Sequence, residues 1–168
     1  FTASDEVNVL RKGRNYGWPQ VEGFCDLASE ITFCNAHNVK EPLLNWTPTI
    51  APSDVVYYTN NSFPEFDDHF ILCTLNTKKL VAIKLNSSGT FSVSQTSYLT
   101  QMFGRLRDIC VGPSKEIYLA TNGANPSNTD PGTHSILVLH PPLPVIGIKE
   151  ATLENNIKVY PTIIQNEL

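Results

Sequence analysis

Two arginines one residue apart are the residues of this sequence best suited to bind an anion. They lie in the stretch GRLRD at positions 104–108, which leads into the β-rich run 106–111. Because side chains alternate along a strand with a period of two, Arg105 and Arg107 are expected on one side of it. Their planar, permanently charged guanidinium groups suit carboxylates and carbonyl oxygens. Spacing alone leaves an alternative open, in which one arginine forms a structural ion pair with Asp108 or another acidic neighbour.

Two aromatic residues form a second candidate group. Tyr16 and Trp18 lie in the stretch GRNYGWP at positions 13–19 and fall on one side of an extended segment. Aromatic side chains of this kind offer a large apolar surface with a polar tip, which suits stacking on a ring-shaped ligand. The alternative is a local packing role, in which Trp18 packs with Pro19.

The elements that must position these residues are β-strands. Helical periodicity is nearly absent, and short β-rich runs are separated by Pro, Gly, Asn and Ser, which predicts an all-β fold. Several runs are apolar almost continuously, which is typical of strands covered on both faces. The predicted strands are residues 55–59, 69–75, 80–85, 90–99, 106–111, 116–121 and 135–140.

These runs repeat with a period of about 50 to 60 residues, which indicates blades of a β-propeller. One unit opens with APSDV (51–55) and the other with VGPS (111–114). Two blades cannot close a ring, since propellers need about four to eight. We therefore expect further blades upstream, and open sheet edges that could allow self-association.

Composition excludes several classes of function. Net charge is −4, which argues against a nucleic-acid partner, and no apolar run is long enough to span a bilayer. Hydrophobic residues make up 41% of the 168 residues, which is sufficient for a folded core.

The sequence contains four cysteines, an even number that allows disulfide pairing. Cys25 and Cys34 flank a short polar loop that a disulfide would close, and such a bond fits an extracytoplasmic protein. Cys73 and Cys110 lie in apolar runs and are expected to be buried free thiols, with a bridge between them as the less favoured alternative. No cysteine or histidine spacing indicates a metal site.

The two motifs together, in this order and about 90 residues apart, resemble the glucose/sorbosone dehydrogenase family over residues 5–141. The resemblance implies part of a six-bladed propeller, about two blades of four-stranded antiparallel sheet. It implies pyrroloquinoline quinone (PQQ) and calcium as cofactors of the full-length protein, with the calcium ligands and the catalytic histidine outside this chain. We therefore assign no catalytic residue here.

The resemblance also implies roles for individual residues. Arg105 and Arg107 would bind the carboxylates and carbonyl oxygens of PQQ and stabilise charge that develops on it. Tyr16 and Trp18 would line the mouth of a sugar pocket. A cofactor-contacting lysine of the family corresponds to Asn76, which can hydrogen-bond but supplies no positive charge.

The C-terminal segment has a different character. After the stretch PPLP at 141–144, residues 143–168 are expected to form a linker and the start of a separate domain, with residues 1–142 forming the blades. The stretch NNIKVYP at 155–161 resembles the opening of a type IX secretion sorting domain, which implies a secreted or cell-surface protein.

Two functions follow as expectations. The first is a PQQ-dependent sugar or aldose dehydrogenase that transfers hydride to the quinone, with this chain alone inactive. The alternative is a non-catalytic propeller that binds a glycan or a protein, because fold does not fix function; Asn76 favours this alternative.

Overall fold

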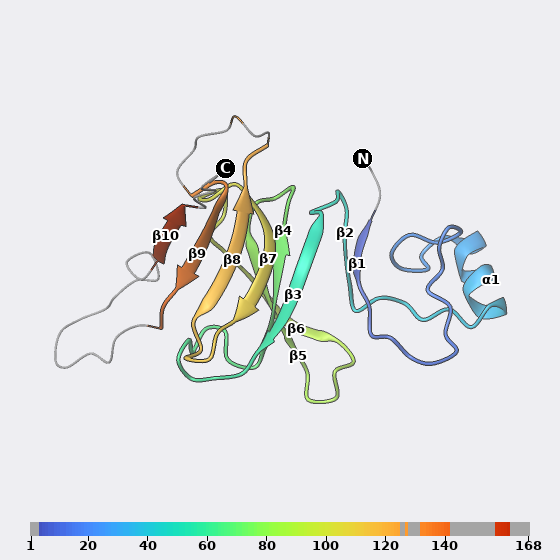
Figure 1. The fold of residues 1–168 in the computed structure, drawn as a ribbon. Helices are drawn as coiled ribbons and strands as arrows, with labels where there is room; N and C mark the ends of the chain where they lie inside the picture. The colour runs from blue at the N-terminus through green and yellow to red at the C-terminus, as the bar shows by residue number, and fades with distance from the viewer. Residues whose placement is uncertain (1–3, 125–126, 128–131, 142–156, 162–168) are drawn as a thin grey trace. The chain divides into compact units, whose positions relative to one another are not determined.

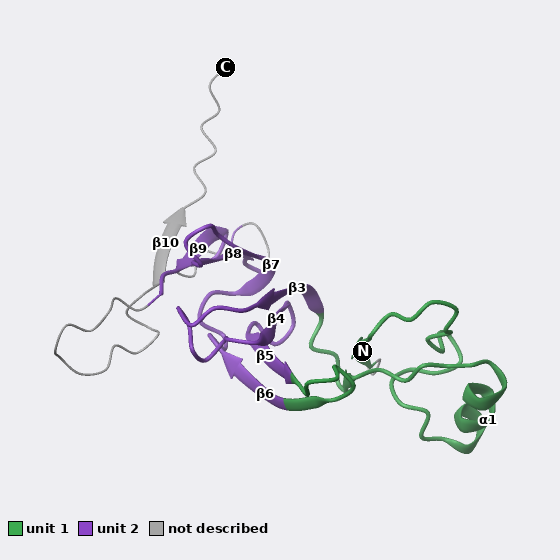
Figure 2. Cartoon of the chain, turned by 90° about the horizontal axis from the view of Figure 1, so that it is seen from below, with its two compact units in different colours: residues 1–51, 85–93 green, residues 52–84, 94–168 purple. Residues whose placement is uncertain are grey.

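The computed structural model describes residues 4–124, 127, 132–141 and the backbone of 157–161. It divides into two compact units: residues 1–51 with 85–93, and residues 52–84 with 94–168 (Figure 2). None of the helices in the described residues is long and apolar enough to cross a membrane.

The first unit holds a small two-stranded sheet and one helix. Strand β1 (Asp5–Val7) pairs antiparallel with β2 (Leu44–Trp46), and α1 spans Ala28–Ala36. The structure contains the disulfide between Cys25 and Cys34, which encloses most of this helix. The prediction of a short polar loop between these cysteines is therefore wrong. No residue of α1 is buried, so apolar periodicity gave no signal for it.

The second unit consists mainly of two four-stranded antiparallel sheets (Figure 1). In each sheet the strands lie in the order in which they occur in the chain. The first sheet has the order β3-β4-β5-β6, and the second has the order β7-β8-β9-β10. The strands of the first sheet are β3 (Pro52–Tyr58), β4 (His69–Thr74), β5 (Leu80–Leu85) and β6 (Ser92–Tyr98). Those of the second are β7 (Arg105–Val111), β8 (Ile117–Asn122), β9 (Ser135–Leu139) and β10 (Ile157–Pro161).

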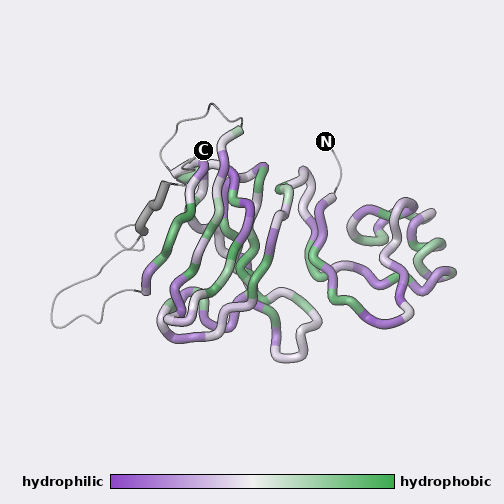
Figure 3. Tube along the Cα trace, in the orientation of Figure 1, coloured by the Kyte–Doolittle hydropathy of each residue, from purple (hydrophilic) through white to green (hydrophobic). Residues whose placement is uncertain are grey.

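One hydrophobic core joins the two sheets. Every second residue of β4, β5, β8 and β9 points into it, and these strands carry hydrophobic stretches, coloured green in Figure 3. Burial of this apolar surface is the main stabilising contribution to the second unit. The core residues are Tyr58, Phe63, Phe66, Ile71, Cys73, Leu80, Ala82, Leu99, Leu106, Ile109, Ile117, Leu119, Leu137 and Leu139.

The all-β prediction is confirmed, and all seven predicted runs are strands with ends within about three residues of the predicted ones. The repeat has the expected length, but its alignment differs from the predicted one. The strand that corresponds to β3 in the second sheet is β7, which begins at Arg105, before the VGPS stretch. Strand β10 pairs with β9 and extends the second sheet, although its residues fall in the segment predicted to open a separate domain. The rest of that segment, residues 143–156 and 162–168, lies outside the described residues.

The two remaining cysteines are free. Cys73 is buried in the core, as predicted. Cys110 is exposed, and its predicted burial is wrong. A β-bulge in β7 shifts the alternation by one residue, so that Ile109 points into the core and Cys110 points away from it.

Candidate functional site

The two arginines lie at the start of β7, off the core face of the sheet. Arg105 is half-buried and stands opposite Asn122 in the β7–β8 register, so the two residues share a face. Arg107 is exposed, and its Nε–H donates a hydrogen bond to Asn122 Oδ1 at 2.9 Å. Asn122 therefore brings both arginines to one place. Among the described residues neither arginine forms an ion pair, and the only one there joins Lys84 to Asp68.

A β-bulge produces this arrangement. Leu106 pairs with Thr121 and Asp108 with Ala120, which leaves Arg107 as the extra residue between two paired neighbours. Leu106 and Ile109 both point into the core, although strict alternation would send them to opposite faces. The bulge thus leaves Arg107 without a partner in the ladder and directs its side chain toward Asn122.

A glycine fixes the entry into β7. Gly104 has φ +74°, a conformation that residues with a Cβ adopt at a cost. A Cβ there would lie 2.8 Å from both the Asn122 carbonyl oxygen and Thr133 Cγ2. The chain just before Arg105 thus packs directly on the end of β8, and only glycine fits.

Asn76 lies in the turn between β4 and β5, where it is exposed. This turn is tied to the segment before β7, because Gln101 N–H donates to the Lys78 carbonyl at 2.8 Å. Asn76, Arg105 and Arg107 therefore come from the same end of the two sheets, where β3 and β7 begin and β4 ends (Figure 1).

The first strands of the two sheets lie side by side in the same direction. Ser53 Oγ on β3 donates to the Leu106 carbonyl at 2.7 Å, and the Asp54 carboxylate accepts from the Ile109 amide at 3.0 Å. Both strands carry a bulge at this level, Ser53 being the extra residue of β3. The two bulged segments are therefore joined by two hydrogen bonds, which fix the position of the strand that bears the arginines.

The environment of Asp54 lowers its pKa. Burial is the largest influence and opposes ionisation, but it is outweighed by other contacts. These are the hydrogen bond from the Ile109 amide, one with the Asp108 side chain and one from the Val55 amide. The buried Cys73 thiol nearby has its pKa raised to about 12, by burial first and then by the charges of Asp54 and Asp108.

A groove of about 420 Å³ runs between the same two strands. It is lined by residues 54–59 of β3 and the position after it, by residues 109–112 of β7 and the position after it, and by Lys115. Neither arginine is among its lining residues, so this groove is not the place where the two guanidinium groups meet.

Tyr16 and Trp18 lie in the first unit, whereas the arginines and Asn76 lie in the second. The Tyr16 hydroxyl accepts from the Arg11 amide at 2.6 Å and donates to the Val9 carbonyl at 3.1 Å, so its polar tip is engaged by the backbone. Trp18 is 73% exposed and leaves its ring free for a ligand. Both line a cavity of about 260 Å³ that is also lined by three acidic residues, Asp5, Glu6 and Glu22.

The NYGWP motif owes its shape to local contacts. Asn15 Oδ1 accepts from the Gly17 amide at 2.9 Å, and Gly17 has φ +88° with Val21 Cβ 2.9 Å from where its own Cβ would lie. Arg14 donates to the carbonyls of Asn38 and Val39. Most residues of the motif therefore stabilise the conformation of the loop, whereas the Trp18 side chain is exposed to solvent.

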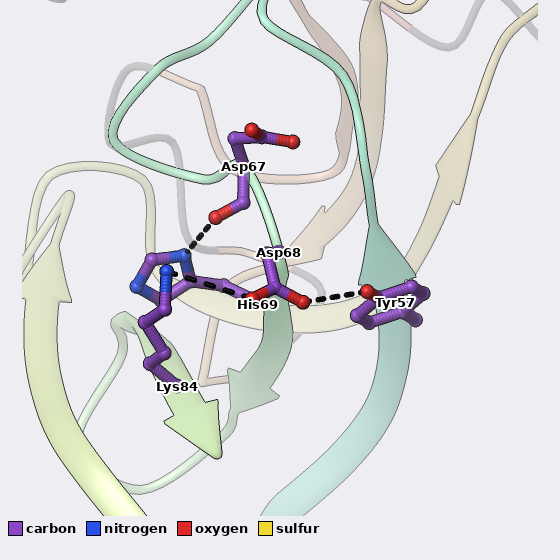
Figure 4. A network of polar contacts seen from close by, with 5 residues as sticks. All are labelled: Tyr57, Asp67, Asp68, His69 and Lys84. Carbon is purple, nitrogen blue, oxygen red and sulfur yellow. Dashed lines mark hydrogen bonds and ion pairs between the residues drawn. The ribbon is translucent and has the colours of Figure 1, made fainter. Parts of the chain in front are cut away.

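A polar cluster on the exposed face of the first sheet has a structural role (Figure 4). Tyr57 Oη donates to Asp68 Oδ1 at 2.7 Å, and Lys84 Nζ lies 3.6 Å from Asp68 Oδ2. The hydrogen bond between Tyr57 and Asp68 raises the pKa of Tyr57 and lowers that of Asp68. His69 Nδ1 donates to the Asp67 carbonyl at 2.7 Å, which is a capping role. The cluster ties three strands together.

Sequence reasoning missed two residues of this region. Asn122 lies just beyond the predicted strand 116–121, and nothing in its neighbours indicates a contact with Arg107, 15 residues away. In the sequence, Asp54 stands out only as part of the repeat. The recurrence of Asp after the bulged residue, at 54 and 108, is the signal that could have found it.

Two four-stranded antiparallel sheets with a shared core and adjacent first strands define this chain as part of a β-propeller. The sequence profile of the Glucose / Sorbosone dehydrogenase family matches residues 2–129. The chain belongs to this family.

Known proteins of similar sequence and structure agree with this assignment. The chain is 27% identical over 126 residues to aldose sugar dehydrogenase YliI of Escherichia coli, covering 70% of this chain and 32% of the relative. It is 29% identical over 124 residues to the Synechocystis protein slr1608, covering 72% and 29%. The PQQ-bound aldose sugar dehydrogenase of Streptomyces coelicolor superposes with TM-score 0.61 at 25% identity, covering 82% of this chain and 36% of that one.

The apo form of the Escherichia coli soluble aldose sugar dehydrogenase shares the fold, with TM-score 0.57 at 24% identity over 70% of this chain and 35% of that one. The chain thus spans about a third of the length of the proteins it matches. Its fold is that of the glucose and aldose sugar dehydrogenases, and its disulfide fits an extracytoplasmic location.

Proposed function

We propose that the whole protein is a quinone-dependent sugar dehydrogenase, in which this chain supplies part of the cofactor site. The observation that carries the proposal is the pair of arginines at the start of β7, brought to one place by Asn122 and without an acidic partner among the described residues. Such a pair leaves two positive charges for an anionic ligand.

The side chains present suit PQQ, which is planar and carries three carboxylates beside its quinone oxygens. Arg105 and Arg107 would bind these oxygens through charge-assisted hydrogen bonds, and Asn76 would add a neutral donor from the β4–β5 turn. PQQ, when bound, supplies the acceptor for two electrons and a proton from the substrate. The guanidinium groups would stabilise negative charge that develops beside them.

The substrate proposed is a sugar with an oxidisable hydroxyl group. Trp18 and Tyr16 would contribute an apolar surface for its ring, as exposed aromatic residues do in many ligand sites. The base that takes the hydroxyl proton would come from parts of the whole protein outside this chain. By the family resemblance, calcium would also be bound outside this chain.

An activity measurement tests the proposal. The whole protein, supplied with PQQ and calcium, is expected to reduce an artificial electron acceptor when aldoses are added. The same preparation without PQQ is the control. Absence of reduction across common aldoses, in a preparation shown to bind PQQ, would argue that the protein is not a sugar dehydrogenase.

The second candidate is a propeller that binds a glycan or protein without catalysis. The observation that favours it is Asn76, a neutral side chain where the family resemblance implies a lysine. It predicts that the whole protein binds a glycan with the same affinity in the presence and absence of PQQ.

The protein is also proposed to act outside the cytoplasm, with residues 143–168 forming a linker and the start of a type IX sorting domain. The disulfide supports an oxidising location. Cell fractionation that finds the protein only in the cytoplasm would contradict this placement.

A further inference from the structure

We infer that Asn122 is a positioning residue, which orients the Arg107 guanidinium for the anionic ligand while leaving its charge uncompensated. The inference rests on the proposed function and adds to it a residue that contacts the arginine rather than the ligand. It begins from the 2.9 Å hydrogen bond between Arg107 Nε and Asn122 Oδ1.

Arg107 requires such an anchor. It is the extra residue of the β7 bulge, so it has no partner across the ladder, and its side chain is exposed. A long flexible side chain in that setting populates many rotamers, and ordering it on binding costs free energy. A hydrogen bond formed before the ligand arrives reduces this cost.

Asn122 is held firmly enough to act as the anchor. It is half-buried and pairs with Arg105 in the ladder, and its carbonyl packs against Gly104. The preceding residue, Thr121, is buried, and its Oγ1 donates to the Gly132 carbonyl at 2.5 Å and accepts from the Ser135 amide at 3.2 Å. The amide therefore projects from a rigid strand end.

The bond uses the Nε–H donor of Arg107 and not the Nη donors that bind carboxylates in pairs. A guanidinium group has five N–H donors, and the contact with Asn122 occupies the single one on Nε. The two Nη atoms keep four N–H groups, and their shared edge can bind a carboxylate in bidentate fashion. The geometry fixes the plane of the group, and no described residue forms a hydrogen bond or ion pair with this edge.

The chemical type of the anchor determines what the site prefers. An amide oxygen is neutral, so it orients Arg107 without cancelling the positive charge. A carboxylate at the same position would make a stronger bond and neutralise the guanidinium. Asn122 thus favours a ligand with carboxylates over a neutral one.

Titration of the whole protein with PQQ, measured by calorimetry, tests the role of Asn122 with two substitutions. Asn122→Ala removes the anchor and is expected to weaken PQQ binding by roughly three- to ten-fold. Asn122→Asp keeps a hydrogen-bond acceptor but cancels the charge, and is expected to weaken binding by about ten-fold or more. Asn61→Asp, which adds the same charge at an exposed loop position, is the matched control and should change little.

The outcomes separate the hypotheses. If Asn122 only stabilises the fold, an Asn122→Ala variant that remains folded should bind PQQ as wild type does, and that result would overturn the inference. Wild-type affinity of Asn122→Asp would overturn it as well. Wild-type protein that binds no PQQ would instead overturn the proposed function, and the inference with it. Thermal unfolding of each variant without ligand shows whether a loss of binding reflects loss of fold.

A second measurement needs no variant at position 122. In wild-type protein without ligand, the ¹⁵N-labelled Nε–H of Arg107, assigned by its loss in Arg107→Lys, should exchange with solvent more slowly than that of the exposed Arg11. Equal exchange rates would show that no anchored arginine exists, and would also overturn the inference.

Discussion

The carboxylate of Asp54 on β3 accepts a hydrogen bond from the backbone amide of Ile109 on β7, at 3.0 Å. This bond joins the first strands of two sheets at the level where both carry a bulge. It lies two residues beyond Arg107, so it connects the packing of the two sheets to the place where the arginines stand.

Removal of this carboxylate should destabilise the second unit. Asp54→Ala leaves the Ile109 amide without its partner, and we expect a loss of about 1–2 kcal/mol in the free energy of unfolding. Urea denaturation, followed by far-UV circular dichroism, measures this free energy. Asp26→Ala, at an exposed position in the first unit, serves as the control. Equal midpoints for the two variants would show that the bond contributes nothing.

The same residue predicts how stability depends on acid. Because the pKa of Asp54 in the folded state lies below its ordinary value of 3.8, the folded state binds fewer protons than the unfolded state in this range. Its stabilising contribution is complete above about pH 3.8 and is lost as pH falls through the lower folded pKa. The unfolding midpoint of Asp54→Asn should therefore fall less between about pH 5 and about pH 2 than that of wild type. Parallel pH profiles would contradict this.

Much of the fold follows from sequence because the strands are marked by apolar runs, such as residues 70–73 and 136–139, between turn residues. The bulges do not follow, since nothing in RLRD distinguishes a regular strand from one with an extra residue at Arg107. For this reason the same-side expectation for the arginines rested on simple alternation, whereas the structure brings them together through Asn122. Helix α1 escaped prediction because it buries no residue and is enclosed by a disulfide.

Gly104 provides a test of the backbone that leads into β7. Gly104→Ala places a methyl group 2.8 Å from the Asn122 carbonyl oxygen and Thr133 Cγ2, in a left-handed conformation. Gly89 is also left-handed but has open space around it, so Gly89→Ala isolates the conformational cost, about 1–2 kcal/mol. Gly104→Ala should lower the thermal midpoint clearly more than Gly89→Ala. A smaller effect at Gly104 would mean that the chain there can move aside.

The two free thiols should differ sharply in reactivity. Cys110 is exposed, whereas Cys73 is buried and has its pKa raised to about 12. Since only the accessible thiolate reacts, iodoacetamide at pH 8 should label Cys110 in the folded protein, and Cys73 only after unfolding. Mass spectrometry of peptides from each condition identifies the labelled residue. Labelling of Cys73 at the same rate under native conditions would contradict the packing of the core.

The central claim is that Arg105 and Arg107 together bind the quinone cofactor, and titration of the whole protein with PQQ tests it most directly. Arg105→Ala and Arg107→Ala should each weaken binding by roughly ten-fold or more, as expected for loss of a charge-assisted hydrogen bond, while Lys12→Ala leaves it unchanged. Binding that is the same in wild type and in both arginine variants would contradict the account.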